Sequence, residues 1–402
     1  MTFPATLDIP PDVMEIARTL EAAGHEAWCV GGAVRDTLLG VPNTDYDVAT
    51  SATPEQVKGL FRKTIAVGER FGTVGVYIRR RTYEVTTFRR DVQTDGRHAV
   101  VEYGASLDED LARRDFTINA IAYHPLRHEW RDPFHGAGDL DGRRIRAVGS
   151  PAERFREDYL RILRGLRFAA RFDFAIEPDT WVAMQAQVSG LGQLSAERVH
   201  EEWFKGLMTA RSLGRLLDLW VTSGAAAIWL PELLNGKLAA RANLLPALEA
   251  MVGAGGARDP VLLTILLCLD PVAALVRLKS SRADIARAAA VLSGSPEPDG
   301  TDPVSVRRWM AAVGEAADDL ITLWQFQHGA PPLWAPVVKG IRERGEPLTR
   351  KQMAVTGDDL RQAGFPPGPE MGLLLDRLLA AVVDDPSLNS REVLLSLART
   401  LA

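Results

Sequence analysis

A pair of glycines near the N-terminus stands where the backbone could approach a phosphate. Gly31 and Gly32 follow the apolar run Ala27–Val30, which is typical of a short buried strand, and they open a predicted helix that contains Arg35. Adjacent glycines let backbone N–H groups come close to a phosphate, the start of a helix adds positive potential, and Arg35 supplies a fixed charge. Alone, such a pattern is more often just a turn.

Two aspartates follow on a predicted strand from 45 to 49. Asp45 and Asp47 lie two residues apart, so on a strand both carboxylates face the same way. Neighbouring carboxylates repel each other unless a cation lies between them, and their hard oxygens suit Mg²⁺. By itself the segment is also consistent with a solvated acidic turn, since Asn43 and Thr44 precede it. A Gly-Gly turn and helix followed by an Asp-x-Asp strand is much rarer by chance.

This combination resembles the DNA polymerase β nucleotidyltransferase superfamily. The resemblance implies a third carboxylate on a later strand, and Glu84 is the candidate, in a predicted strand from Thr82 to Phe88. That strand follows another from Val74 to Ile78 across an arginine-rich turn, and the β-branched content of both favours strands. A solvent-facing or structural role for Glu84 stays open.

The superfamily's reaction explains why these residue types are needed. A hydroxyl attacks an α-phosphate in line, and pyrophosphate leaves. Two metal ions can lower the pKa of the hydroxyl and neutralise the leaving pyrophosphate, so the protein mainly supplies position and charge. The resemblance therefore implies Mg²⁺ as the cofactor, with Asp45 and Asp47 as its ligands and with Asp45, Asp47 and Glu84 as the catalytic carboxylates.

Five further segments narrow the resemblance to the bacterial class II tRNA nucleotidyltransferases and their poly(A) polymerase relatives. The match covers nearly the whole chain, and the RRDFTINA and EDYLR segments are highly specific in order and spacing. The segments begin at Arg113 (RRDFTINA), Asp132 (DPF, with Gly138, Asp139 and Leu140), Glu157 (EDYLR, continuing to Arg164 and Arg167), Ser195 (SAER) and Thr356 (TGDDL, with Gly364 and Pro367-Gly368-Pro369).

This family implies a head, neck, body and tail, with catalysis in the head. We expect an α+β nucleotidyltransferase head with a small mixed or antiparallel sheet over residues 1–150. An all-helical remainder follows, with a neck and base-recognition helix over 151–210, a body over 211–300 and a tRNA-binding tail over 301–402. The residues agree, because Ala152–Arg171 is one long helical pattern and few β-branched runs follow it.

The EDYLR segment also has a physical interpretation of its own. On a helix, Asp158 and Arg161 are three residues apart and Glu157 and Arg161 four apart, so all can meet on one side. On an isolated helix this would be a surface ion pair. The resemblance favours a protein template for the incoming base, because an aspartate accepts and an arginine donates hydrogen bonds. Cytosine and adenine both offer an amino donor beside a ring-nitrogen acceptor, whereas guanine and uracil place a carbonyl against the carboxylate.

The resemblance assigns further residues to the nucleotide. Arg164 and Arg167 are implied to face its phosphates or base, and a solvated basic helix face is the alternative for both. The segment from Asp91 to Gly104 is implied to help the switch to adenine, but Arg97-His98-Ala99 stands where relatives often carry Arg-Arg-Pro, which leaves the A step open. The pocket itself is expected to be lined by Gly31, Gly32, Arg35, Arg114, Asp115 and Asn119.

The composition is that of an ordinary globular protein, with 402 residues of which 46% are hydrophobic and 25% charged. The net charge of −5 means that a nucleic-acid function needs local arginine clusters. Cys29 and Cys268 offer neither a zinc-ligand spacing nor a disulfide framework, and no signal peptide is seen, so we expect a cytoplasmic protein. The apolar run Pro260–Leu269 is too short to cross a membrane and indicates a buried helix.

The expected function is template-independent addition of C and A, from CTP and ATP, to the 3′ end of tRNA. A poly(A) polymerase, or an enzyme that adds only A or only CC, would share the chemistry and stays open. A catalytically silent RNA-binding module is opposed by intact Asp45 and Asp47, and an antibiotic nucleotidyltransferase is not expected to carry RRDFTINA or EDYLR. No protein partner is implied.

Overall fold

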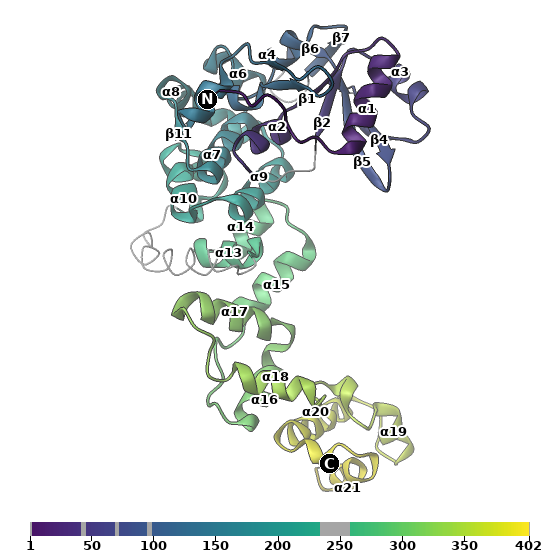
Figure 1. The fold of residues 1–402 in the computed structure, drawn as a ribbon. Coiled ribbons are helices and arrows are strands. Elements are labelled where there is room, and N and C mark those ends of the chain that lie inside the picture. The colour runs from purple at the N-terminus through teal and green to yellow at the C-terminus, as the bar shows by residue number, and fades with distance from the viewer. Residues whose placement is uncertain (1, 42–45, 69–71, 95–98, 234–257, 402) are drawn as a thin grey trace. The chain divides into compact units, whose positions relative to one another are not determined.

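The structure is a computed structural model of the 402-residue chain. It describes all residues except 1, 42–45, 69–71, 95–98, 234–257 and 402. The chain divides into two compact units, one of residues 1–235 with 277–279 and the other of residues 236–276 with 280–402. Figure 1 colours the first unit from purple to teal and the second from green to yellow.

A mixed sheet forms the centre of the head, as the sequence predicts. Within the described residues it has seven strands in the order β3-β4-β5-β2-β1-β8-β9, and only β2 and β5 run parallel (Figure 1). The strands are β1 (Ala27–Val30), β2 (Asp47–Thr50), β3 (Thr64–Gly68), β4 (Thr73–Ile78), β5 (Arg81–Thr87), β8 (Ala122–His124) and β9 (Glu129–Arg131).

The pairing register brings the predicted catalytic segments together. Val30, the last residue of β1, pairs with Asp47, the first residue of β2. On the other side of β2, Val48 pairs in parallel with Val85 of β5. Asp47 and Glu84 each precede one of these paired valines. Because side chains alternate along a strand, the two carboxylates lie on the same face of the sheet, on adjacent strands.

Local signals place several head elements as predicted. The strand at Ala27–Val30 and the strand pair β4–β5 are confirmed, and helix α3 (Pro54–Leu60) begins at a local capping signal. Thr53 caps α3, because its hydroxyl accepts a hydrogen bond from the backbone N–H of Gln56 while the Gln56 side chain accepts one from Thr53 N–H. The strand predicted over 45–49 begins at Asp47 and ends at Thr50, and Asp45 lies outside the described residues.

Helices flank the sheet on both faces. Helix α1 covers the face that presents Tyr83, since the Tyr83 hydroxyl donates a hydrogen bond to the buried Asp12 carboxylate of α1. Glu84 faces the other way. The remaining head elements are α1 (Pro11–Ala22), α2 (Gly32–Leu38), α4 (Leu107–Ala112), η2 (Thr117–Asn119), α5 (Gly136–Asp141), β10 (Arg144–Ile145) and the hairpin of β6 (Arg89–Thr94) and β7 (Ala99–Tyr103).

The prediction of one long helix over Ala152–Arg171 is wrong. The segment forms α6 (Pro151–Glu157) and α7 (Leu160–Phe172), and Asp158 between them has extended backbone angles, φ −155° and ψ 105°. The Asp158 carboxylate accepts a hydrogen bond from the backbone N–H of Leu160, a local bond that competes with helix continuation. Tyr159 packs so closely on Gly190 that a Cβ there would lie 2.2 Å from the tyrosine ring.

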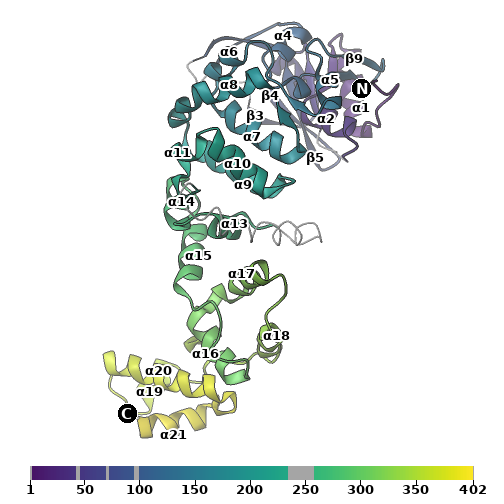
Figure 2. The ribbon, with the colours of Figure 1, turned by 90° about the vertical axis from the view of Figure 1, so that its left-hand side faces the viewer.

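Further helices complete the first unit beside α7 (Figure 2). A second small correction concerns the helical remainder, because Ala175–Ile176 (β11) pairs in parallel with β10. The backbone N–H groups of Ala175 and Glu177 donate to Arg143 and Ile145 of the head, which draws the chain into extended form. The helices are α8 (Pro178–Gln187), η3 (Val188–Gln193), α9 (Ala196–Thr209), α10 (Leu213–Thr222), α11 (Ala225–Trp229) and η4 (Pro231–Leu233).

The second unit is helical throughout its described part. The predicted helix at the apolar run is α13, with Leu263 and Leu267 fully buried, and the segment Gly294–Asp302 connects α15 to α16. The elements are α13 (Pro260–Leu267), α14 (Pro271–Arg277), α15 (Arg282–Ser293), α16 (Pro303–Val313), η5 (Gly314–Ala316), α17 (Ala317–His328), α18 (Ala335–Glu343), η6 (Arg350–Gln352), α19 (Gly357–Gln362), α20 (Pro369–Asp384), η7 (Pro386–Leu388) and α21 (Arg391–Leu401).

None of the helices in the described ranges combines the length and the apolar character that a membrane span requires.

Candidate functional site

One cavity in the first unit collects most of the residues that the sequence singled out. Its volume is about 490 Å³, and its walls come from the β1–α2 turn, the start of β2, the segment 113–119, the α6–α7 break, α7 and α9. Eight arginines and three aspartates line it, which makes it strongly cationic. The lining residues are Gly31, Gly32, Arg35, Asp47, Arg113, Arg114, Asp115, Asn119, Asp158, Leu160, Arg161, Arg164, Arg167, Phe168, Arg171 and Arg198.

The Gly-Gly turn forms the wall next to the sheet. Gly31 has φ +75° and ψ −136°, a conformation that side chains with a Cβ rarely adopt. A Cβ at this position would also lie 3.1 Å from Arg114 Nη1 and 3.5 Å from Asp47 Oδ2. Glycine is therefore required here both by the turn and by the close approach of an arginine and an aspartate.

Arg35 lies deep in the cavity wall. Its guanidinium donates hydrogen bonds to Asp36 and to Asn119 Oδ1, and it lies over the rings of Phe168 and Phe172, 5.0 and 4.7 Å from their centroids. Burial lowers the pKa of Arg35, and the neighbouring Asp36 carboxylate opposes that shift. The sequence-predicted cation is thus present in the cavity, held in place by partners from the head and the neck.

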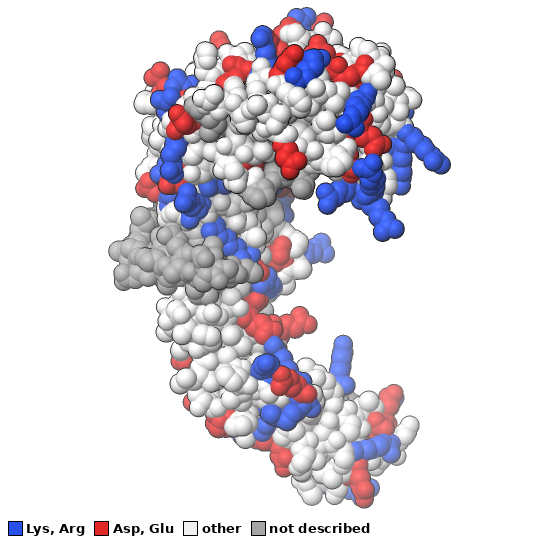
Figure 3. All heavy atoms as spheres, in the orientation of Figure 1, with Lys and Arg blue, Asp and Glu red and all other residues white. Residues whose placement is uncertain are grey.

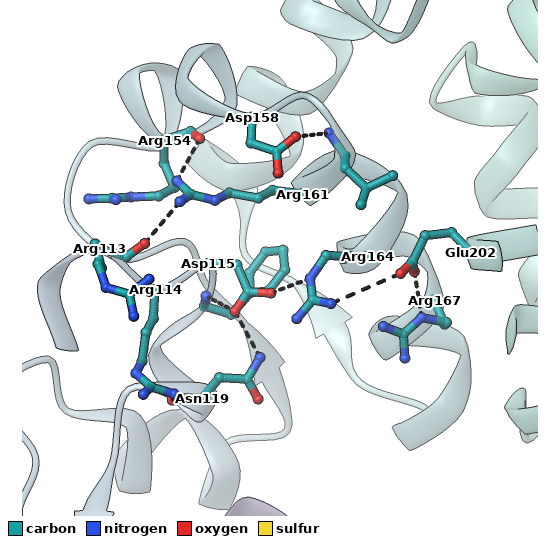
Figure 4. Close-up of polar contacts among 12 residues, drawn as sticks. Arg113, Arg114, Asp115, Asn119, Arg154, Asp158, Arg161, Arg164, Arg167 and Glu202 are labelled. Carbon is teal, nitrogen blue, oxygen red and sulfur yellow. Dashed lines mark hydrogen bonds and ion pairs between the residues drawn. The ribbon is translucent and has the colours of Figure 1, made fainter. Parts of the chain in front are cut away.

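Asp115 is the buried acid at the centre of the site (Figure 4). It accepts hydrogen bonds from Arg164 Nε at 2.7 Å, from Asn119 Nδ2 at 2.9 Å and from the backbone N–H of Phe116 at 2.8 Å. Burial alone would raise the pKa of Asp115. The charge of Arg164 and these hydrogen bonds outweigh burial and hold the pKa below its usual range. Asp115 therefore links the RRDFTINA segment to α7 as a carboxylate.

Asp158 and Arg161 both reach the cavity, and their contacts in the structure are with other residues rather than with each other. Arg161 donates to the Glu157 carboxylate at 2.5 Å and to the backbone carbonyls of Arg154 and Arg113. Asp158 accepts from Arg198 of α9 at 2.7 Å. Asp158 lies in the break between α6 and α7, whereas Arg161 lies in the first turn of α7, and Figure 4 shows both side chains.

Arg164 and Arg167 lie one turn apart on α7 and share an acidic neighbour. Arg167 Nε donates to Glu202 Oε2 of α9 at 2.6 Å, and Arg164 Nη1 lies 4.0 Å from Glu202 Oε1 (Figure 4). The charge of Asp115 raises the pKa of Arg164, and Glu202 adds to that effect. Both guanidiniums also lie over Phe168, which sits on the same helix. These contacts exclude a freely solvated basic helix face.

The predicted catalytic carboxylates differ in their position relative to the cavity. Asp47 lines the cavity, whereas Glu84 is exposed on β5 and does not line it. Glu84 nevertheless shares a sheet face with Asp47, as the strand register shows. Asp45 lies outside the described residues, so the geometry of the predicted pair is not described.

Several cavity residues were missed from the sequence. Arg113 stood in the RRDFTINA segment and Arg198 in the SAER segment, but neither was given a role. Arg171 follows Arg167 by four residues on the same helix, a spacing that could have identified it. Phe168 was given no site role from the sequence, yet its ring lies beneath three of the cavity arginines.

A second group of cations is exposed just before β3 and at the turn between β4 and β5. Figure 3 shows Lys and Arg side chains projecting from the side of the head where Figure 1 places the β4–β5 hairpin. The exposed residues here include Arg62, Lys63, Arg80 and Arg81. An acidic chain therefore carries the local positive potential that contact with phosphates requires.

Family models match three parts of the chain. They are described as "Poly A polymerase head domain" over residues 27–146, "Probable RNA and SrmB-binding site of polymerase A" over residues 173–236, and tRNA nucleotidyltransferase domain 2 over residues 338–398.

Curated relatives match along the whole chain. The CCA-adding enzyme of Levilactobacillus brevis is 36% identical over 96% of this chain and 98% of its own length. That of Streptococcus sanguinis is 37% identical over 93% of both chains. Among solved structures, the CCA-adding enzyme of Bacillus stearothermophilus in complex with CTP is 33% identical and superposes with a TM-score of 0.82, covering 98% of each chain.

Proposed function

This chain belongs to the family of CCA-adding enzymes, which are tRNA nucleotidyltransferases, and we propose that it adds C and A nucleotides from CTP and ATP to the 3′ end of tRNA. The observation that carries the proposal is that one cavity joins Asp47 to Asp158 and Arg161. A carboxylate suited to a metal and a donor–acceptor pair suited to a base therefore face the same space.

The chemistry of the carboxylate ligands supports Mg²⁺ as the proposed metal. Carboxylates on adjacent strands, Asp47 of β2 and Glu84 of β5, lie on one face of the sheet and offer the hard oxygens that Mg²⁺ prefers. With Asp45 they form the proposed catalytic set, in which Asp45 and Asp47 hold Mg²⁺. Bound Mg²⁺ would lower the pKa of the tRNA 3′ hydroxyl and neutralise charge on the leaving pyrophosphate.

The nucleotide is proposed to occupy the cationic cavity. A triphosphate carries several negative charges, and eight arginines against three aspartates supply the complementary charge. Gly31 and Gly32 allow close approach beside Asp47. The cations and polar groups proposed to hold the nucleotide are Arg35, Arg114, Asp115, Asn119, Arg164 and Arg167.

Base choice is proposed to rest on Asp158 and Arg161. Each Asp158 oxygen has one protein partner, Leu160 N–H or Arg198, so lone pairs remain to accept from a base amino group. A guanidinium carries five N–H donors, and the Arg161 side chain donates to Glu157 and to two backbone carbonyls, so donors remain for a ring nitrogen. Cytosine and adenine satisfy both groups. Guanine and uracil oppose the carboxylate with a carbonyl and leave the site's own groups unpaired.

The division of the chain and its compartment are further proposals. A head over 1–150, a neck over 151–210, a body over 211–300 and a tail over 301–402 would leave RNA contact mainly to the helical part. Neither Cys29 nor Cys268, both buried, forms a disulfide in the described chain, which supports work in a reducing cytoplasm.

Single-nucleotide incorporation tests the function directly. A tRNA ending just before the CCA, one ending in C and one ending in CC are each incubated with one labelled nucleoside triphosphate. We expect C on the first two and A only on the third. Repeated A on any end would indicate a poly(A) polymerase, and addition of only C or only A would indicate a partial enzyme.

A further inference from the structure

A buried glutamate behind the cavity holds two of its arginines. Glu202 of α9 is 4% exposed and is not among the residues that line the cavity. Its Oε2 accepts a hydrogen bond from Arg167 Nε at 2.6 Å, and its Oε1 lies 4.0 Å from Arg164 Nη1. Figure 4 shows the carboxylate on the side of the two arginines away from Asp115.

The cavity needs such a counter-charge. Three guanidiniums, those of Arg35, Arg164 and Arg167, lie 5.0, 5.3 and 4.4 Å from the centroid of one ring, that of Phe168. Like charges crowded around one ring repel each other, and burial strengthens the repulsion because it removes screening water. An acidic partner for each guanidinium offsets this repulsion and fixes its direction.

Each of the three arginines has a different acidic partner. Arg35 pairs with Asp36 in the head, and Arg164 pairs with Asp115 in the RRDFTINA segment. Arg167 pairs with Glu202, which comes from α9, 35 residues further along the chain. Asp36 and Asp115 lie in segments that the sequence associates with the nucleotide, and Glu202 does not.

We propose that Glu202 is a positioning residue for nucleotide binding, which rests on the proposed function of the cavity. Its carboxylate fixes Arg167 and, through charge, Arg164, so that both cations are already directed into the cavity when a nucleoside triphosphate arrives. Because Glu202 does not line the cavity, it acts only through these arginines. Preorganised cations bind an anion without first losing side-chain freedom or overcoming mutual repulsion.

This role has a specific kinetic signature. Asp158 and Arg161 are not partners of Glu202, so the choice between bases does not depend on it. Weakening the contacts that hold Arg164 and Arg167 should therefore raise the KM for CTP and for ATP by the same factor. The KM for tRNA and the preference for C and A over U and G should stay unchanged, and kcat should change less than KM.

The test is Glu202→Gln in the full chain, with Glu201→Gln as the matched control. Glutamine keeps the volume and an acceptor oxygen but removes the charge. Glu201 is the neighbouring residue on the same helix, exposed and paired with Lys205. We expect Glu202→Gln to raise the KM for both nucleotides about tenfold, as for a weakened charge-assisted hydrogen bond. The control should match the wild type.

Two further measurements separate positioning from folding. The melting temperature of each variant shows whether α9 still packs, and CTP binding without tRNA reports the cavity alone. Glu202→Asp restores the charge on a shorter side chain and should recover part of the affinity, which is not expected if packing volume alone matters. A variant that melts early but binds CTP with wild-type affinity would reduce Glu202 to a structural ion pair.

Other outcomes would also overturn the proposal. These are an unchanged KM for both nucleotides, an equal rise in the KM for tRNA, or the same loss in Glu201→Gln. If the wild-type enzyme failed to add C or A to tRNA, the proposed function would be wrong. Direct CTP binding would still decide the role of Glu202, so the two failures are distinguishable.

Discussion

Replacing Asp158 with alanine should change which nucleotides the enzyme uses. In the structure the carboxylate makes two contacts, one from the backbone N–H of Leu160 at 3.0 Å and one from Arg198 at 2.7 Å. Both help to hold it at the cavity wall, where we propose that it accepts a hydrogen bond from the amino group of cytosine or adenine. Alanine removes the acceptor and also the negative charge that opposes a carbonyl.

The size of the effect follows from the type of bond. A hydrogen bond to a charged group contributes about 1.5–3 kcal/mol. With about 1.4 kcal/mol for each factor of ten, kcat/KM for CTP and ATP should fall about 10- to 150-fold in Asp158→Ala. Use of UTP and GTP should rise only partly, because Arg161 still faces a ring N–H in those bases, and two donors cannot pair.

The assay measures kcat/KM for all four nucleotides on a tRNA that ends just before the CCA. Alanine also removes the hydrogen bond from the Leu160 backbone N–H and the ion pair with Arg198, so melting temperatures are measured alongside. Glu153→Ala is the matched control, because Glu153 is an exposed acid on the neighbouring helix α6. It should leave all four values unchanged.

One result would refute this reasoning. If Asp158→Ala kept the wild-type ratio of CTP to UTP use, the carboxylate would be no more than a structural partner of Leu160 N–H and Arg198. Base choice would then have to come from other groups in the cavity.

Three other changes test the rest of the site. Asp47→Asn should abolish incorporation of both CTP and ATP while tRNA binding persists, and removal of Mg²⁺ from the wild type should do the same reversibly. Turnover close to that of the wild type with Mg²⁺ in either case would exclude the proposed metal site. Gly31→Ala should lower the free energy of unfolding by about 1–3 kcal/mol, because alanine is strained at φ +75° and its Cβ would lie 3.1 Å from Arg114 Nη1. Thermal unfolding and kcat are measured together. An unshifted melting temperature would mean that the turn relaxes. In the folded state Arg164 and hydrogen bonds outweigh burial and hold the pKa of Asp115 below its ordinary value, so the carboxylate stabilises the fold above the unfolded pKa of about 4 and this contribution is lost as the pH falls below it. Asp115→Asn should therefore be less stable than the wild type at neutral pH and should lose less stability on acidification. Acid-unfolding curves that run parallel for the two proteins would contradict this.

Much of the head could be predicted because its signals are local. The strand Ala27–Val30 is an apolar run with a glycine turn at its end, and Thr53 and Pro54 are adjacent residues whose chemistry starts a helix without outside help. The resemblance, through RRDFTINA and EDYLR, named most of the cavity residues. It did so because those residues occupy a few short segments whose order along the chain is distinctive.

The break between α6 and α7 shows where local pattern fails. The apolar spacing over Ala152–Arg171 is helical on both sides of Asp158, so periodicity alone predicts one helix. Two interactions decide otherwise, the side-chain hydrogen bond from Asp158 to Leu160 N–H and the packing of Tyr159 on Gly190. The second joins residues about thirty positions apart in the chain, and it depends on how η3 packs against the break.

The sequence by itself determined the fold class, the strands around the Gly-Gly turn and the identity of most cavity residues. Only the tertiary structure decided which charges pair. Arg167 pairs with Glu202 and Asp158 with Arg198, across 35 and 40 residues, because α9 packs along α7. A pattern of charges along a chain gives the candidates for such pairs. Their choice depends on which helix faces come together, and that depends on the packing of the whole unit.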